Sequence, residues 1–127
     1  MAARSPTQLV IGIDIGGTNI NAAAATLSIG GFLPRVVAAA HCPTPRADPA
    51  RFYAAVTDLV RTLQASVGPH QGTILPLVAV AHPGRFLSDG TLARGTTPNL
   101  GTTDGEFDGV KPAEELARRL GWRVFAE

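Results

Sequence analysis

Residues 9–20 read Leu-Val-Ile-Gly-Ile-Asp-Ile-Gly-Gly-Thr-Asn-Ile, and this segment constrains the fold more than any other. Its β-branched residues predict a strand that leads through Asp14 into a turn at Gly16–Gly17. Glycine lets backbone N–H groups approach an anion, because no Cβ blocks them and positive φ carries no steric penalty. Thr18 adds a hydroxyl donor, and Asp14 offers a carboxylate to a metal-bound water. The segment predicts a loop facing a phosphate or its metal; an ordinary hairpin turn between two antiparallel strands is the alternative.

Composition limits the class of protein. The 127 residues fit one domain, and 45% hydrophobic with 17% charged residues supplies a core. The net charge of +1 gives no basic footprint for nucleic acid. The single Cys42 excludes an internal disulfide and fits the cytoplasm, or simply fills a place in the core. No segment approaches the ~18 apolar residues of a membrane helix. We therefore expect a cytoplasmic protein with no nucleic-acid or membrane partner.

Five strands are predicted from the apolar runs and turn signals. Glycine turns, including Gly30–Gly31, join the first three strands, which favours an antiparallel meander. The fourth run is short, apolar and bounded by turns, which predicts a buried strand inside the sheet. The expected strands cover about 8–15, 19–28, 32–42, 75–81 and 122–126.

Two helices are predicted between the later strands. Asp48 is a suitable N-cap before Pro49, and the apolar stripe that follows lasts until Gly68–Pro69 ends the helix. The second helix begins at Pro112 and stops at Gly121. The resulting order is β-β-β-α-β-α-β, an α/β protein with a mixed sheet. A long irregular segment from about 82 to 110 precedes the second helix, and loops of this length are usually functional.

The loop at Asp14 resembles the first phosphate-binding loop of the actin-like ATPase and sugar-kinase superfamily. Its wording, Asp-Ile-Gly-Gly-Thr-Asn, is most similar to the ROK family of bacterial repressors and sugar kinases. It is neither a Walker A loop nor a dinucleotide fingerprint. The resemblance implies a ribonuclease-H-like, actin/hexokinase-type ATPase domain over residues 9–127, after a disordered segment at 1–8. It also implies ATP and Mg²⁺ as cofactors, served by the loop residues Asp14, Gly16, Gly17, Thr18 and Asn19.

The irregular segment carries a second part of the resemblance. It holds Pro83-Gly84-Arg85, then Asp89-Gly90, then Pro98-Asn99-Leu100, in the order found in ROK kinases. The resemblance implies that Gly84, Arg85 and Asn99 bind a sugar, and an amide both donates to and accepts from a hydroxyl. An Asx turn at Asn99 and a solvated surface charge at Arg85 are the alternatives. Asp89-Gly90 is expected to be only a hairpin turn.

Histidines add little to the predicted chemistry. His82 stands at the end of the fourth strand, where it either touches the ligand or forms a structural hydrogen bond. The spacing of His41, Cys42, His70 and His82 does not match a zinc site.

The general base of the ROK family is expected beyond this segment of sequence. In the family an Asp follows the last of these strands within a Glu-Asn-Asp-type segment, and Glu127 matches the residue before the Asn-Asp pair. No catalytic residue is therefore expected within residues 1–127, because proton abstraction needs a carboxylate in reach of the hydroxyl. The resemblance implies an ATP-dependent kinase of a hexose or N-acetylhexosamine, present as an amino-terminal fragment that is inactive alone and oligomeric, if at all, in a full-length form. A non-catalytic sugar-sensing or repressor-related ROK protein, or an inactive gene fragment, is the alternative.

Overall fold

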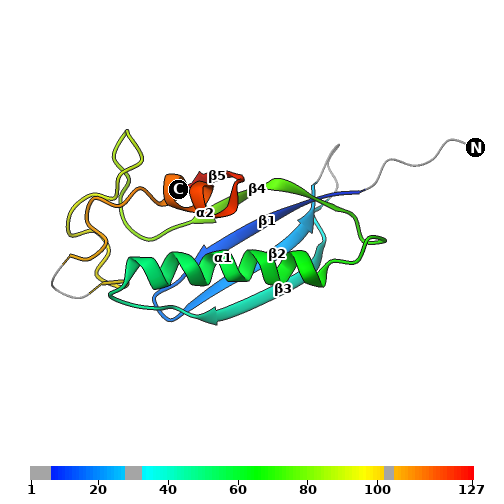
Figure 1. Ribbon diagram of the computed structural model, residues 1–127, viewed down its shortest axis with the longest axis horizontal. Coiled ribbons are helices and arrows are strands. Elements are labelled where there is room, and N and C mark those ends of the chain that lie inside the picture. The colour runs from blue at the N-terminus through cyan, green and yellow to red at the C-terminus, as the bar shows by residue number, and fades with distance from the viewer. Residues whose placement is uncertain (1–6, 28–32, 102–104) are drawn as a thin grey trace, which may run out of the picture.

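One five-stranded sheet and two helices make up the computed structural model, which describes residues 7–27, 33–101 and 105–127 (Figure 1). The α/β class and the mixed sheet agree with the sequence prediction. In chain order the elements are β1 (Gln8–Ile15), β2 (Asn19–Thr26), β3 (Val36–Pro43), α1 (Pro49–Ser66), β4 (Thr73–Ala81), α2 (Pro112–Leu120) and β5 (Arg123–Ala126).

The strands lie in the order β3-β2-β1-β4-β5. β1 pairs with β2, and β2 with β3, in antiparallel fashion, which gives the expected meander. β4 pairs in parallel with both β1 and β5, so α1 and α2 are the connections that return the chain for each parallel strand. The carboxyl ends of β1, β4 and β5 therefore meet at one edge of the sheet.

Several strand boundaries differ from the prediction: β2 ends at Thr26 and β4 begins at Thr73, each two residues from the expected position. β3 begins at Val36 rather than near residue 32, because Pro34 has no N–H to donate to a strand ladder. The expected Gly30–Gly31 turn lies outside the described residues. Residues 1–8 were expected to be disordered, yet Gln8 already belongs to β1 and the Thr7 carbonyl accepts a hydrogen bond of 2.7 Å from the Thr73 N–H. Residues 1–6 lie outside the described part of the chain.

Local signals place both helices. The Asp48 side chain accepts a hydrogen bond of 3.1 Å from the Arg51 N–H, which makes it the expected N-cap of α1. Pro112 opens α2, and Gly121 ends it in the left-handed conformation with φ 69°. None of the helices in the described ranges is long and apolar enough to cross a membrane.

Both helices pack on the same side of the sheet, which we call the covered face. Side chains from β1, β2 and β4 point into this layer, where they meet α1, α2 and the loop that follows β4. The fully buried members include Ile11, Ile20, Phe52, Val60, Val78, Leu100, Phe107 and Leu116. This layer is the hydrophobic core, and Leu92, Leu100 and Phe107 attach to it the described parts of the segment after β4, residues 82–101 and 105–111.

The opposite side of the sheet, the open face, carries mostly small and polar side chains, together with the exposed hydrophobic residues Val36 and Phe125. Strand pairing places Ala39, Ala23, Gly12, Ala79 and Phe125 in a row across all five strands. We call the first four of these residues the small-residue row. β4 was expected to be buried throughout, but Ala79 and Ala81 are exposed because neither helix covers this face.

Candidate functional site

A pocket of about 330 Å³ lies at the edge where β1, β4 and β5 end. Its lining comes from the β1–β2 turn, the end of β4, the loop at Asn99 and the residue after β5. The residues are Asp14, Ile15, Gly16, Gly17, Ala81, His82, Pro83, Asn99 and Glu127. Segments more than one hundred residues apart in sequence thus meet at one point. Pockets outside the carboxyl ends of parallel strands are the usual ligand sites of open α/β sheets.

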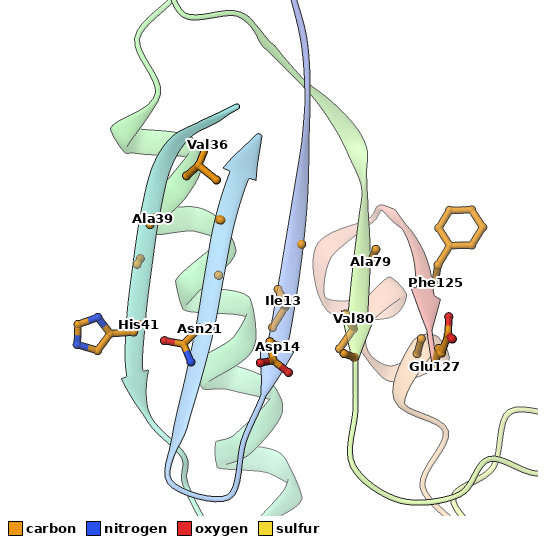
Figure 2. Close-up of a pocket in the computed structure, with 16 residues that line it drawn as sticks. Ile13, Asp14, Asn21, Val36, Ala39, His41, Ala79, Val80, Phe125 and Glu127 are labelled. Atoms are coloured by element: carbon orange, nitrogen blue, oxygen red, sulfur yellow. The ribbon is translucent and has the colours of Figure 1, made fainter. Parts of the chain in front are cut away.

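Asp14 stands at the centre of this edge. Strand pairing sets it opposite Asn21 on β2 and Ala81 on β4, and Asn21 lies opposite His41 on β3. We call Asp14, Asn21 and His41 the polar row. Figure 2 views the open face with α1 behind the strands, and it shows Asp14 and Glu127 at the ends of their strands. Since no described residue forms an ion pair with Asp14, its carboxylate is available to a ligand.

The turn at Gly16–Gly17 needs glycine for space and not for positive φ. A Cβ on Gly17 would lie 3.3 Å from the Asn99 Cβ, and one on Gly16 would lie 3.1 Å from the Asn19 carbonyl oxygen. Neither residue adopts a positive φ. Contacts within the chain therefore account for glycine at both positions, and neither residue uses the positive φ that the sequence analysis allowed for. The same turn joins the antiparallel strands β1 and β2, as the alternative interpretation of an ordinary hairpin turn requires.

Thr44, which sequence reasoning did not single out, fixes this turn. Its hydroxyl donates a hydrogen bond of 2.8 Å to the Gly16 carbonyl, and its N–H donates one of 2.9 Å to the Thr18 carbonyl. The only sequence signal was a threonine between Pro43 and Pro45 directly after a strand. The partners are 26 and more residues away, so the pairing was not readable from local pattern.

His82 forms a buried structural hydrogen bond. Its Nε2 lies 2.9 Å from the Tyr53 hydroxyl, and its Nδ1 lies 2.7 Å from the Pro83 carbonyl oxygen. Because that carbonyl only accepts, Nδ1 carries the proton and Nε2 accepts from Tyr53. Burial lowers the pKa of His82 and raises the pKa of Tyr53, which keeps both groups neutral. The His82 N–H also donates to the Glu127 carbonyl at 2.8 Å, so this residue connects α1, β4 and the end of β5.

Four of the predicted site residues lie outside the lining of this pocket. Thr18 is exposed and Asn19 opens β2, each engaged through its carbonyl. Gly84 adopts φ 103°, and a Cβ there would lie 2.7 Å from the Thr97 Cγ2, so glycine is required for packing. Arg85 is exposed, with its N–H donating to the Thr96 hydroxyl at 3.1 Å. The exposed guanidinium is the arrangement expected of a solvated surface charge.

The remaining predictions concern turns and metals. Asp89-Gly90 forms the expected hairpin turn, closed by hydrogen bonds between Leu87 and Thr91 and between Gly90 and Leu87. Burial raises the pKa of the Cys42 thiol, which packs against the core. Within residues 7–27, 33–101 and 105–127, no three His, Cys, Asp or Glu side chains cluster as metal ligands would.

Comparison with known proteins gives a structural likeness only. No family model matches this chain, and no curated protein matches it in sequence. Among solved structures, the ROK hexokinase from Thermus thermophilus matches with a TM-score of 0.67 and 24% identity, over 94% of this chain and 34% of that protein. The ROK glucokinase from Streptomyces griseus, solved with glucose and AMPPNP, matches with a TM-score of 0.70 and 22% identity, over 94% and 32%.

A regulator shares the same fold. A ROK family transcriptional regulator, a homologue of the E. coli MLC protein, matches with a TM-score of 0.70 and 15% identity, over 94% of this chain and 27% of that protein. The expected resemblance to ROK proteins is thus confirmed for the fold, which is that of the sugar kinases of the actin and hexokinase type. This chain spans about a third of the length of the two kinases it matches.

Proposed function

We propose that this chain is the phosphate-facing part of an ATP-dependent sugar kinase of the ROK type. The supporting observation is the pocket in which a free carboxylate, a glycine turn and an amide converge: Asp14, Gly16, Gly17 and Asn99. These groups suit the phosphates and the metal of a nucleotide, together with a hydroxylated substrate. The reaction would be transfer of the ATP γ-phosphoryl group to a hydroxyl of a hexose or N-acetylhexosamine.

Mg²⁺ fits this donor set as a partner of ATP. Mg²⁺ prefers oxygen ligands, keeps several waters, and is bound through one or two carboxylates plus substrate phosphates. Asp14 provides such a carboxylate, and Gly17 brings its backbone close to the pocket. When bound, the ion would neutralise charge on the transferred phosphoryl group. Thr18 and Asn19 would act at the rim of the turn.

Asn99 is the residue we assign to the sugar within the pocket. Gly84 and Arg85 belong to the same loop and would act from its outer part, provided that the sugar extends there. Catalysis itself we assign to a general base on a segment that follows Glu127 in a longer kinase. We therefore expect residues 1–127 to show no sugar-dependent ATP turnover.

A non-catalytic sugar sensor is the second candidate, because a ROK family regulator shares this fold. Isothermal titration with glucose and with Mg·ATP separates the two functions. A kinase segment should bind Mg·ATP, and the Gly17→Ala variant, which crowds Asn99, should weaken that binding. A sensor would bind glucose and leave Mg·ATP unbound. Binding of neither ligand would refute both proposals and favour an inactive fragment.

A further inference from the structure

We propose that Thr44 is the positioning residue of the Gly16–Gly17 turn, holding its peptide groups so that the Gly17 N–H faces the pocket as an anion donor. The identity of the anion as an ATP phosphate rests on the proposed function. The orientation of the turn does not, and it is tested separately below.

Two hydrogen bonds from Thr44 hold carbonyl groups of the turn on one side. The hydroxyl of Thr44 reaches the Gly16 carbonyl at 2.8 Å, and its N–H reaches the Thr18 carbonyl at 2.9 Å. Thr44 is only 9% exposed. It directly follows β3, whose last residue, Pro43, pairs with Asn19. The anchor is therefore fixed by the sheet and not by the turn that it holds.

Peptide geometry turns this anchoring into a direction for the donor. The bond between Gly16 and Gly17 is trans, so the Gly17 N–H points opposite to the Gly16 carbonyl. That carbonyl is directed at Thr44, which sends the N–H away from β3. None of the described residues accepts a hydrogen bond from the Gly17 N–H, and Gly17 lines the pocket. An unsatisfied N–H at a glycine turn is the donor that anion sites use.

The pair of glycines is the reason that an anchor is needed. Close packing against Asn99 excludes a Cβ, yet glycine has more backbone freedom than any other residue. A hydrogen bond of 2.9 Å from the Gly16 N–H to the Asn19 carbonyl closes the turn, but among the described residues only Thr44 bonds the peptide group between the two glycines. Gly16 and Gly17 have no side chains that could restrict their backbone, and the hydrogen bonds from Thr44 provide that restriction.

The segment from Thr44 to Ala47 also contacts the loop that carries Asn99 on the other side of the pocket. The Ala47 N–H donates a hydrogen bond of 2.7 Å to the Leu100 carbonyl, next to Asn99. Ala47 adopts φ 63°, which an alanine maintains only under restraint. One short segment thus positions both the glycine turn and the loop of Asn99.

Thr57 offers a matched control for the hydroxyl of Thr44. Both threonines are 9% exposed, and both donate a hydrogen bond of 2.8 Å to a backbone carbonyl, but Thr57 lies within α1 and bonds Tyr53. Thr44→Val and Thr57→Val therefore remove equivalent hydroxyls, and Thr44→Ser retains the anchor. If the two valine variants lower Tm by the same amount, any difference between them at the turn comes from the position of the hydroxyl and not from a general loss of stability.

The first measurement needs no ligand. Backbone ¹⁵N relaxation of the full 127-residue chain should show the Gly16 and Gly17 order parameters falling in Thr44→Val, from about 0.85 toward 0.6. The Gly17 amide resonance should also shift, and neither change should occur in Thr57→Val or Thr44→Ser. Unchanged order parameters and shifts in Thr44→Val would overturn the proposal.

The second measurement uses Mg·ATP as the probe. Thr44→Val should weaken binding roughly five- to tenfold, the effect of one lost orienting hydrogen bond, while Thr57→Val binds like the parent chain. Equal affinity of Thr44→Val and parent would overturn the donor role of Gly17. If the parent chain does not bind Mg·ATP, the kinase proposal fails, and the relaxation experiment alone decides the role of Thr44.

Discussion

The two faces of the sheet carry opposite kinds of side chain, although these alternate along the same strands. On β1, Ile11, Ile13 and Ile15 enter the covered face, whereas Gly12 and Asp14 belong to the open face. The covered face carries mainly large apolar side chains. The open face carries the small-residue row and, two residues further along each strand, the polar row that reaches the pocket.

Neighbouring residues of one strand therefore have different roles, one stabilising the core and the next facing the candidate site. Because side chains along a strand alternate with period two, each core residue of β1 fixes the position of a neighbour on the open face. Asp14 is held between Ile13 and Ile15, which are 4% and 5% exposed. The buried pair anchors the strand end without engaging the carboxylate. The predictions below test whether the two faces are as independent as this arrangement implies.

The largest effect is expected on the covered face. Ile11→Ala should lower the free energy of unfolding by about 2–5 kcal/mol, since Ile11 is fully buried and its truncation leaves a cavity. Val36→Ala on the open face should change it by less than about 0.5 kcal/mol, because Val36 is 59% exposed. Urea denaturation measures both, with Ile11→Val as a milder variant costing about 1 kcal/mol. Similar losses for Ile11→Ala and Val36→Ala would show that the open face is buried in solution.

Asp14→Asn should separate binding from stability on the open face. Loss of the carboxylate should weaken Mg·ATP binding by about tenfold or more, because a charged oxygen near the metal is replaced by a neutral one. The free energy of unfolding should change by less than about 0.5 kcal/mol, since Asp14 is exposed. Titration calorimetry and urea denaturation give the two quantities. Asp58→Asn, the same change at an exposed position of α1, should alter neither, and an equal loss of binding there would point to a non-specific charge effect.

Sequence predicted the parts of the fold that depend on local signals. The N-cap at Asp48, the left-handed Gly121 and the Asp89-Gly90 turn each follow from a few neighbouring residues. The spatial order of the strands and the exposure of β4 did not, because pairing and helix placement join distant segments. The start of β3 was missed by four residues, although Pro34 was a visible obstacle.

The candidate site was predictable to a similar extent. Asp14 and the two glycines carry a recognisable pattern, and Asn99 lies in the same pocket. Thr44 was missed because its partners lie across the sheet edge, where no spacing rule applies. Gly84 was chosen for a ligand contact, yet the tight approach of Thr97 shows a packing need at that position. Sequence pattern thus identified the turn but not what holds it.

His82 connects α1, β4 and the end of β5, and its protonation should destabilise the fold. Burial lowers its pKa below the usual 6.5, so below about pH 6.5 the unfolded chain binds more protons than the folded chain. Measured between about pH 5 and pH 8, the free energy of unfolding should therefore increase with pH and level off above about pH 7. The Glu115 and Asp89 carboxyls, whose pKa values are lowered by hydrogen bonds, stay ionised throughout this range. The neutral Tyr53 hydroxyl that faces His82 does not titrate there either.

The control for this pH dependence is a second histidine on the open face. His82→Asn should flatten the profile, whatever its absolute stability, and the exposed His41→Gln should leave the slope as in the parent chain. Urea denaturation at several pH values gives the slopes. A slope that persists in His82→Asn would assign the proton uptake to another group.

The smallest change in the free energy of unfolding is expected for Gly12→Ala, which tests whether the open face is exposed to solvent. A Cβ on Gly12 meets nothing within 4 Å, and its φ is not positive, so alanine fits without strain. Because glycine within a strand is less favourable than alanine by roughly 0.5–1 kcal/mol, the variant should be more stable by about 0.5 kcal/mol. Gly17→Ala should have the opposite sign, since its Cβ meets Asn99 at 3.3 Å. If Gly12→Ala instead lowers stability, and the loss grows with protein concentration, a second copy covers the small-residue row, and the contrast between the faces belongs to the isolated chain alone.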